Sequence, residues 1–131
     1  MKPLGVLIFC GFVSSGQGNG KKFLELNWVK QQIEEKLGYS VFPGTLNLTL
    51  NKESVKQKVL LNKMQALQII PAKGYCFGFI YKARINEIEC AVVVPDVENY
   101  PENILEVIAP IYLREALKIK DGNVLAINVL V

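Results

Sequence analysis

The chain has 131 residues, of which half are apolar, and a net charge of only +3, which fits one domain over residues 1–131 with a single hydrophobic core. Histidine is absent from the sequence, which excludes histidine-based acid–base catalysis, histidine-containing triads and most zinc sites. Lysine and arginine are scattered and form no basic stripe, so we expect an anionic small ligand and no nucleic-acid partner.

The first part of the chain predicts a strand, a glycine-rich loop and a helix. Residues 4–13 form a nearly continuous apolar run, which predicts a strand that is buried on both faces. The run lacks a small-residue cleavage site and is too short to cross a membrane, so we expect a cytoplasmic protein without a membrane partner. Apolar residues then recur at helical spacing, which predicts an amphipathic helix over residues 23–37 that ends at Gly38.

The rest of the chain predicts mainly strands. Residues 51–62 are polar and indicate a loop or a short helix, and Pro110 suits the first turn of another short helix through Leu117. Asn86 and Glu87 have the spacing of a two-residue hairpin turn. The expected strands cover residues 45–50, 65–71, 75–85, 88–95, 104–108 and 124–131. Six or seven strands, two helices and no regular alternation predict a mainly β fold, a small closed barrel with two packed helices.

The three cysteines, Cys10, Cys76 and Cys90, form no C-x-x-C pair, and each lies in an apolar stretch. A free cysteine in an apolar stretch usually behaves as a small hydrophobic residue of the core. We therefore expect buried free thiols in a reducing compartment rather than a disulfide or a nucleophile.

The loop after the first strand carries glycines at alternate positions, Gly16, Gly18 and Gly20. Glycines permit positive φ and close backbone approach, so successive N–H groups can form a nest for phosphate, and Lys21 and Lys22 could neutralise its charge. The spacing differs from both the P-loop and the dinucleotide motif. A flexible turn between strand and helix explains the pattern about as well, so both interpretations stay open.

Thr45 and Asn47 lie two residues apart on a predicted strand and therefore point to the same side of it. A hydroxyl and an amide oxygen side by side suit Mg²⁺, which takes few protein ligands and completes its shell with water and phosphate. Two neutral ligands would hold the cation weakly without a nucleotide. The pattern alone favours the simpler interpretation, the polar face of an edge strand.

Four segments stand out when they are taken together: residues 11–23, residues 37–48 with L-G-Y and P-G-T-L-N-L, residues 91–95 with A-V-V-V-P, and residues 105–122 with E-V-I-A-P, L-R-E and K-D-G. In this order, over nearly the whole chain, they resemble the CTP-dependent riboflavin kinases first known from archaea. The P-G-T-L-N and E-V-I-A-P…L-R-E blocks are specific, whereas the glycine loop is specific only alongside them. The resemblance implies a six-stranded barrel of the cradle-loop type.

The resemblance also implies an activity and its site. The γ-phosphate of CTP would pass to the 5′-hydroxyl of riboflavin, giving FMN and CDP, with Mg²⁺ as the cofactor held by Thr45 and Asn47. Glu98 and Glu106 would lie at the flavin, and Glu106 is a candidate general base by residue type. The nucleotide would be bound by Gly16, Gln17, Gly18, Asn19, Gly20, Lys21, Ile111, Tyr112, Leu113 and Arg114.

Some alternatives remain open at this stage. Without the resemblance, Glu106 could be a structural carboxylate, Tyr112 a surface aromatic and Arg114 a solvated helix charge. Glu98 stands where the family often carries a threonine that touches the flavin, which allows a kinase of another small alcohol. A non-catalytic barrel that binds DNA or another protein is the third hypothesis. CTP preference over ATP and the oligomeric state are not determined by the sequence.

Overall fold

Six antiparallel strands form a closed barrel in the computed structural model, which describes residues 5–16, 22, 24–61, 66–70, 78–96 and 99–130. Their order around the barrel is β4-β5-β6-β2-β1-β7, and pairing between β4 and β7 closes it. The six strands are β1 (Val6–Ser14), β2 (Leu46–Leu50), β4 (Gly78–Ile85), β5 (Ile88–Pro95), β6 (Ile104–Ile108) and β7 (Val124–Leu130). A seventh strand, β3 (Leu67–Ile69), pairs with β4 outside the ring. The predicted mainly β fold with a closed six-stranded barrel is confirmed.

The barrel interior is filled by alternate residues of each strand, as a sheet with one buried face requires. Leu46, Leu48 and Leu50 are 5%, 0% and 6% exposed, so they point inward. Thr45 and Asn47 alternate with these leucines and are only partly buried. The alternation expected for residues 45–50 is therefore confirmed, and it leaves the polar side chains of this segment on the outer face of the barrel.

The prediction that the first strand is buried on both faces is wrong. Phe9 and Val13 are 0% and 1% exposed, whereas Ile8 and Phe12 are 52% and 47% exposed. A strand in a barrel wall has only one face toward the core, and β1 keeps apolar residues on its outer face as well. Apolar composition alone could not distinguish this arrangement from a strand covered on both sides.

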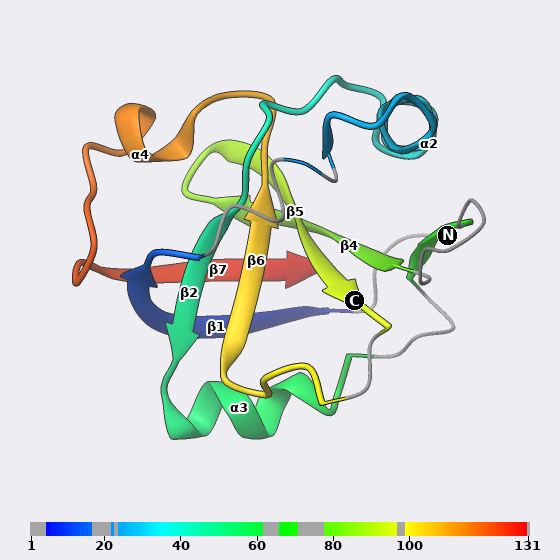
Figure 1. Ribbon diagram of the computed structural model, residues 1–131. Coiled ribbons are helices and arrows are strands. Elements are labelled where there is room, and N and C mark those ends of the chain that lie inside the picture. Colours follow the sequence, from blue (N-terminus) through cyan, green and yellow to red (C-terminus); the bar gives the residue numbers. More distant parts are fainter. Residues whose placement is uncertain are drawn as a thin grey trace.

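Three helices lie around the barrel in the described part of the chain, α2 (Asn27–Leu37), α3 (Lys52–Lys58) and the four-residue α4 (Leu113–Ala116). Figure 1 shows α3 beneath one end of the barrel and both α2 and α4 beyond the opposite end. Two packed helices were expected. The additional one is α3, in a segment for which the sequence left loop and short helix open.

Helix α2 covers the outer side of the sheet near β3. Its buried residues Val29 and Ile33 join a cluster with Ile69, Ile80, Ala91 and Ile108. Gly38 ends the helix in the left-handed region at φ 83°, as expected for a glycine C-cap. The predicted start at residue 23 is too early, because Leu26 is extended at ψ 130° and the helix begins one residue after it. The expected first residue, Phe23, lies outside the described residues.

Helix α3 is tied to the barrel through its first turn. The Asn51 side chain accepts a hydrogen bond from the Ser54 amide at 2.9 Å, the usual pattern of a helix N-cap. Ser54 is 2% exposed, and its Oγ accepts a hydrogen bond from the Cys10 amide of β1 at 2.7 Å. These two contacts fix α3 against one end of the barrel.

Strands β4 and β5 are joined by a tight turn. Asn86 has φ 54°, and Ile85 pairs with Ile88, so the expected two-residue hairpin turn is confirmed. Cys10 and Cys90 are free thiols, but only Cys90 is buried; Cys76 lies outside the described residues. No helix among the described residues is long and apolar enough to cross a membrane.

Candidate functional site

Three oxygen-bearing side chains meet where β2 begins. In the β2–β6 pair, Asn47 lies directly opposite Glu106. The Thr45 hydroxyl lies 3.0 Å from Asn47 Oδ1 and 3.2 Å from Glu106 Oε1, within hydrogen-bond distance of both. All three residues are partly buried. The β2–β6 register therefore brings together Thr45 and Glu106, which are 61 residues apart in the sequence.

The root of the glycine loop lies against this group. Ser14, the last residue of β1, pairs with Asn47 across the β1–β2 ladder. A Cβ atom on Gly16 would lie only 2.3 Å from Asn47 Nδ2. Gly16 is therefore needed for close approach to the Asn47 amide. The rest of the predicted phosphate loop, Gln17, Gly18, Asn19, Gly20 and Lys21, lies outside the described residues.

The donor set fits a hard cation such as Mg²⁺. Hydroxyl, amide and carboxylate oxygens are the ligand types that Mg²⁺ prefers, and Thr45, Asn47 and Glu106 present one of each. The described residues contain no cluster of three Asp, Glu, Cys or His side chains that could hold a metal. A cation here would accordingly have a single protein carboxylate and would need further charge from a bound anion.

Glu106 is held from its other side by Tyr100. The Tyr100 hydroxyl donates to Glu106 Oε2 at 2.5 Å. Burial first, and then the adjacent Glu106, raise the pKa of Tyr100 well above its ordinary value of 10.0, so the phenol keeps its proton as the donor. The Lys58 ammonium lies 5.3 Å from the centre of the Tyr100 ring. Neither Tyr100 nor Lys58 was expected from the sequence at this site.

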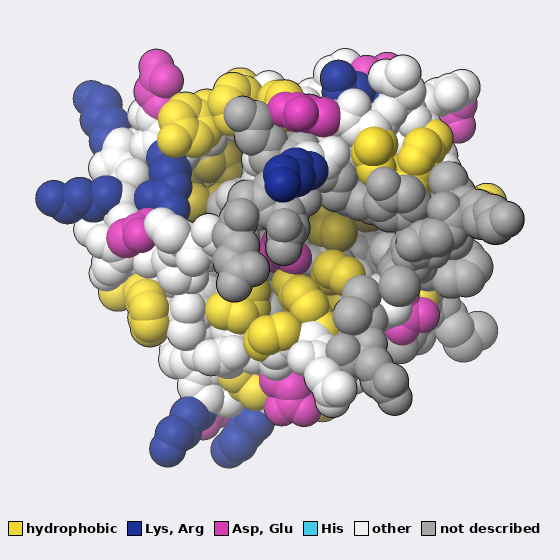
Figure 2. All heavy atoms as spheres, viewed as in Figure 1, with side chains coloured by type: hydrophobic (Ala, Val, Ile, Leu, Met, Phe, Trp, Pro, Cys, Tyr) yellow, Lys and Arg dark blue, Asp and Glu magenta, His cyan; other side chains and the backbone are white. Residues whose placement is uncertain are grey.

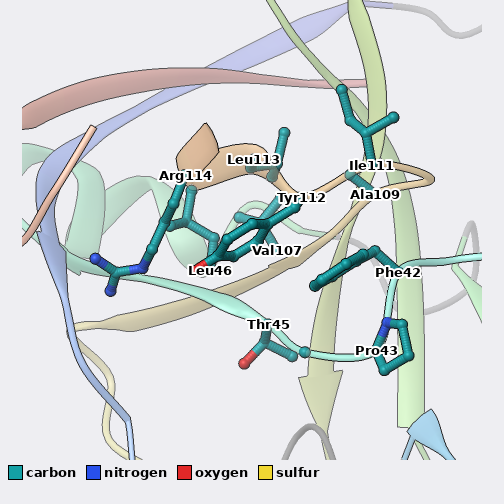
Figure 3. Close-up of a pocket in the computed structure, with 11 residues that line it drawn as sticks. Phe42, Pro43, Thr45, Leu46, Val107, Ala109, Ile111, Tyr112, Leu113 and Arg114 are labelled. Atoms are coloured by element: carbon teal, nitrogen blue, oxygen red, sulfur yellow. The ribbon is translucent and has the colours of Figure 1, made fainter. Parts of the chain in front are cut away.

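A shallow pocket opens beside α4, next to Thr45. Phe42 and Tyr112 stack at its rim with ring centroids 4.9 Å apart and planes 17° apart. Figure 2 shows hydrophobic side chains around a hollow in the region of α4, and Figure 3 shows the two rings facing each other above Thr45. The lining residues are Phe42, Pro43, Gly44, Thr45, Leu46, Val107, Ala109, Ile111, Tyr112, Leu113 and Arg114.

Arg114 extends from α4 away from the aromatic pair and toward the end of β1 (Figure 3). Its Nη2 lies 2.7 Å from Asp121 Oδ1 and 3.3 Å from the Ser14 carbonyl oxygen. Ser15 donates a hydrogen bond to the other Asp121 oxygen. These hydrogen bonds, from Ser15 first and then Arg114, hold the pKa of Asp121 below its ordinary value of 3.8.

The predicted site residues within the described part of the chain fall into two groups, one around Asn47 and one in the α4 segment. Thr45, Asn47 and Glu106 are in contact, and Gly16 lies against Asn47. Glu98, the position of the expected flavin contact, lies outside the described residues. The four predicted residues of the α4 segment all line the pocket, although Leu113 is also a core residue at 4% exposure; these are Ile111, Tyr112, Leu113 and Arg114. The ligand roles of all these residues stay predictions.

Several contacts at the site were missed by sequence reasoning. Asp121 carried a signal only within the K-D-G segment of the family resemblance, and Phe42 only as the residue before Pro43-Gly44. Tyr100 and Lys58 carried none, because their partners are set by tertiary contacts rather than by local spacing.

The sequence is similar to one family of proteins over almost its whole length. A family model for CTP-dependent riboflavin kinases, described as domain of unknown function DUF120, matches residues 13–129. Among curated relatives, a riboflavin kinase of Pyrobaculum aerophilum is 37% identical over 92% of this chain and 59% of its own length. A riboflavin kinase of Archaeoglobus fulgidus is 38% identical over 96% of this chain and 56% of its own length. One of Methanosarcina acetivorans is 39% identical, with 90% and 52% covered.

The chain spans a little over half the length of the curated relatives it matches. Within that span the similarity includes both strands that carry the oxygen-bearing group, β2 and β6, as well as the α4 segment. From this match over residues 13–129 we conclude that the chain belongs to the family of CTP-dependent riboflavin kinases.

Proposed function

We propose that this chain transfers the γ-phosphate of CTP to the 5′-hydroxyl of riboflavin, producing FMN and CDP, with Mg²⁺ as the cofactor. The observation that carries the proposal is the meeting of Thr45, Asn47 and Glu106 beside Gly16 at the root of the glycine loop. Oxygen atoms of the kind that bind Mg²⁺ thus lie next to the backbone of Gly16, which has no side chain to keep a phosphate away. Family membership supplies the expected substrates.

On the donor side, the pocket beside α4 supports nucleotide binding. Phe42 and Tyr112 offer flat apolar surface for a base, because aromatic rings stack on a base of either kind. Arg114 provides positive charge close to the backbone of Ser14, where the glycine loop begins. In this proposal the phosphates lie over the loop and the base lies at the Phe42–Tyr112 rim.

Thr45 and Asn47 would hold Mg²⁺, with Glu106 beside them, and the cation, when bound, neutralises charge on the transferring phosphate. Phosphoryl transfer needs positioning and charge neutralisation more than covalent help from the protein. In the present arrangement Glu106 Oε2 accepts a hydrogen bond from Tyr100, and Glu106 Oε1 lies 3.2 Å from the Thr45 hydroxyl. We therefore favour an orienting role for Glu106 over that of a general base.

The test is FMN formation by the purified protein with riboflavin, CTP and Mg²⁺. Thr45→Ala and Asn47→Ala should impair it severely, because each removes a proposed cation ligand. Lys56→Ala is the control, since Lys56 is 77% exposed and pairs only loosely with Glu53 at 4.0 Å. ATP, GTP and UTP are assayed in parallel to establish the nucleotide preference.

Two other outcomes would change the assignment. If no nucleotide yields FMN, and CTP with Mg²⁺ raises the melting temperature whereas riboflavin does not, the assignment changes to a related kinase of another alcohol, as the Glu98 position allows. If no nucleotide has any effect on either activity or melting temperature, phosphoryl transfer by this chain is contradicted.

A further inference from the structure

The Glu106 carboxylate bridges two hydroxyl groups. Its Oε1 lies 3.2 Å from Thr45 Oγ1, and its Oε2 accepts a hydrogen bond from the Tyr100 hydroxyl at 2.5 Å. Among the described residues, no hydrogen bond joins Tyr100 to Thr45 or Asn47, and Glu106 connects it to them. Tyr100, Glu106 and Thr45 therefore form a hydrogen-bonding series, which runs from the loop before β6 to the start of β2.

The acceptor to which Thr45 donates its proton decides whether the Thr45 lone pairs are available to a cation. A hydroxyl has one proton and two lone pairs. Without a cation, the Thr45 proton has two acceptors within reach, Asn47 Oδ1 at 3.0 Å and Glu106 Oε1 at 3.2 Å. If Asn47 Oδ1 turns its lone pairs to a cation, Glu106 is the remaining acceptor, and donation to it leaves the Thr45 lone pairs free for the cation.

Tyr100 is itself held in place by Lys58 of α3. The Lys58 ammonium donates to the carbonyl oxygens of Ile104 at 2.9 Å and Glu102 at 3.4 Å, in the segment between Tyr100 and Glu106. It also lies 5.3 Å from the centre of the Tyr100 ring, a cation–π distance. The loop that carries Tyr100 is thus attached to a helix, which limits where the phenol hydroxyl can point.

We propose that Tyr100 is a positioning residue for the cation site. Its hydroxyl fixes the Glu106 carboxylate in the orientation that accepts the Thr45 proton, and Thr45 in turn presents its lone pairs to the cation. Residues that orient a metal ligand typically change metal affinity by about 10–100-fold when removed. The inference rests on the proposed function in that the cation is the one bound with the nucleotide.

The experiment measures cation binding without turnover. Mg²⁺ is titrated into the protein saturated with CDP, and affinity is followed by calorimetry and by melting temperature. Tyr100→Phe should weaken Mg²⁺ binding about tenfold and leave CDP binding in the absence of Mg²⁺ unchanged. Tyr39→Phe is the matched control, because the buried Tyr39 hydroxyl has no hydrogen-bond partner in the described structure.

A second variant separates orientation from general stability. Glu106→Gln keeps the shape of the side chain but makes a poorer acceptor, so it should also weaken Mg²⁺ binding. In the Glu106→Gln background, Tyr100→Phe should add almost nothing, because the series is already interrupted. Additive losses in the double variant would mean that Tyr100 acts independently of Glu106 and would overturn the proposal.

The remaining outcomes also decide the matter. If Tyr100→Phe binds Mg²⁺ as tightly as the wild type does, the inference is overturned. The proposed function still stands in that case if the wild type forms FMN. If Tyr100→Phe does not fold, wild-type Mg²⁺ affinity in Glu106→Gln overturns the inference instead. If the wild type shows no Mg²⁺-dependent CDP binding and forms no FMN, the proposed function fails and the inference fails with it.

Discussion

Arg114 and Asp121 form an ion pair with Nη2 and Oδ1 2.7 Å apart, and this pair connects the pocket beside α4 to the root of the glycine loop. Asp121 also accepts a hydrogen bond from Ser15, and Arg114 reaches the carbonyl oxygen of Ser14. The turn before β7 therefore holds together two segments that the proposed function assigns to the nucleotide.

Replacing Asp121 with Asn should weaken nucleotide binding. The change removes the charge that holds Arg114 near Ser14, and since Asp121 is 53% exposed the effect should be small, a rise of about twofold to fivefold in the Kd for CTP. Calorimetric titration of CTP measures it. Glu53→Gln is the control, because Glu53 is 81% exposed and lies on α3, at the end of the barrel opposite α4 (Figure 1). An unchanged Kd in Asp121→Asn would show that Arg114 needs no such partner.

The same carboxylate should contribute to acid stability. The pKa of Asp121 in the folded protein lies below its ordinary value of 3.8, so its contribution is fully present above that value and is lost as pH falls through the lower, folded-state pKa. Urea unfolding from about pH 6 to about pH 2.5 should show that Asp121→Asn reduces the acid-dependent loss of stability. A parallel pH profile for wild type and variant would contradict this assignment.

Substituting Gly16 with Ala should disturb the cation site with little effect on stability. The new Cβ would lie 2.3 Å from Asn47 Nδ2, and the end of a side chain can turn away more easily than backbone. The Asn47 amide should rotate, so we expect weaker Mg²⁺-dependent CTP binding and a nearly unchanged urea midpoint. Gly5→Ala is the matched control, since its Cβ meets no atom within 4 Å. Equal Mg²⁺ affinity in both variants would contradict a close Gly16–Asn47 contact.

Cys90 should resist alkylation in the folded protein. Burial, more than any nearby charge, raises the pKa of the Cys90 thiol to about 12, and the thiolate is the reactive form. At about pH 8, iodoacetamide should label the partly exposed Cys10 first and label Cys90 only after denaturation. Peptide mass spectrometry of native and denatured samples gives the comparison. Rapid native labelling of Cys90 would mean that β5 opens readily.

The strands were predictable where one physical requirement dominated. Residues 45–50 alternate because a barrel wall has one buried face, and the Asn86-Glu87 turn follows from hairpin geometry. The first strand was misjudged because β1 exposes Ile8 and Phe12 on its outer face, which an apolar run does not reveal. The start of α2 was placed too early because the apolar periodicity extends to residues before Leu26, whereas the backbone of Leu26 is extended.

The sequence by itself determined the class of fold and the placing of Thr45 and Asn47 on the same side of one strand segment, because these depend on residue type and short-range spacing. Only the tertiary structure decided that Glu106 lies between Thr45 and Tyr100 and that Asp121 joins Arg114 to Ser15. The physical reason is that those contacts depend on strand register and on loop closure between distant segments. A shift of one residue in the β2–β6 register would turn Glu106 to the other face of the sheet.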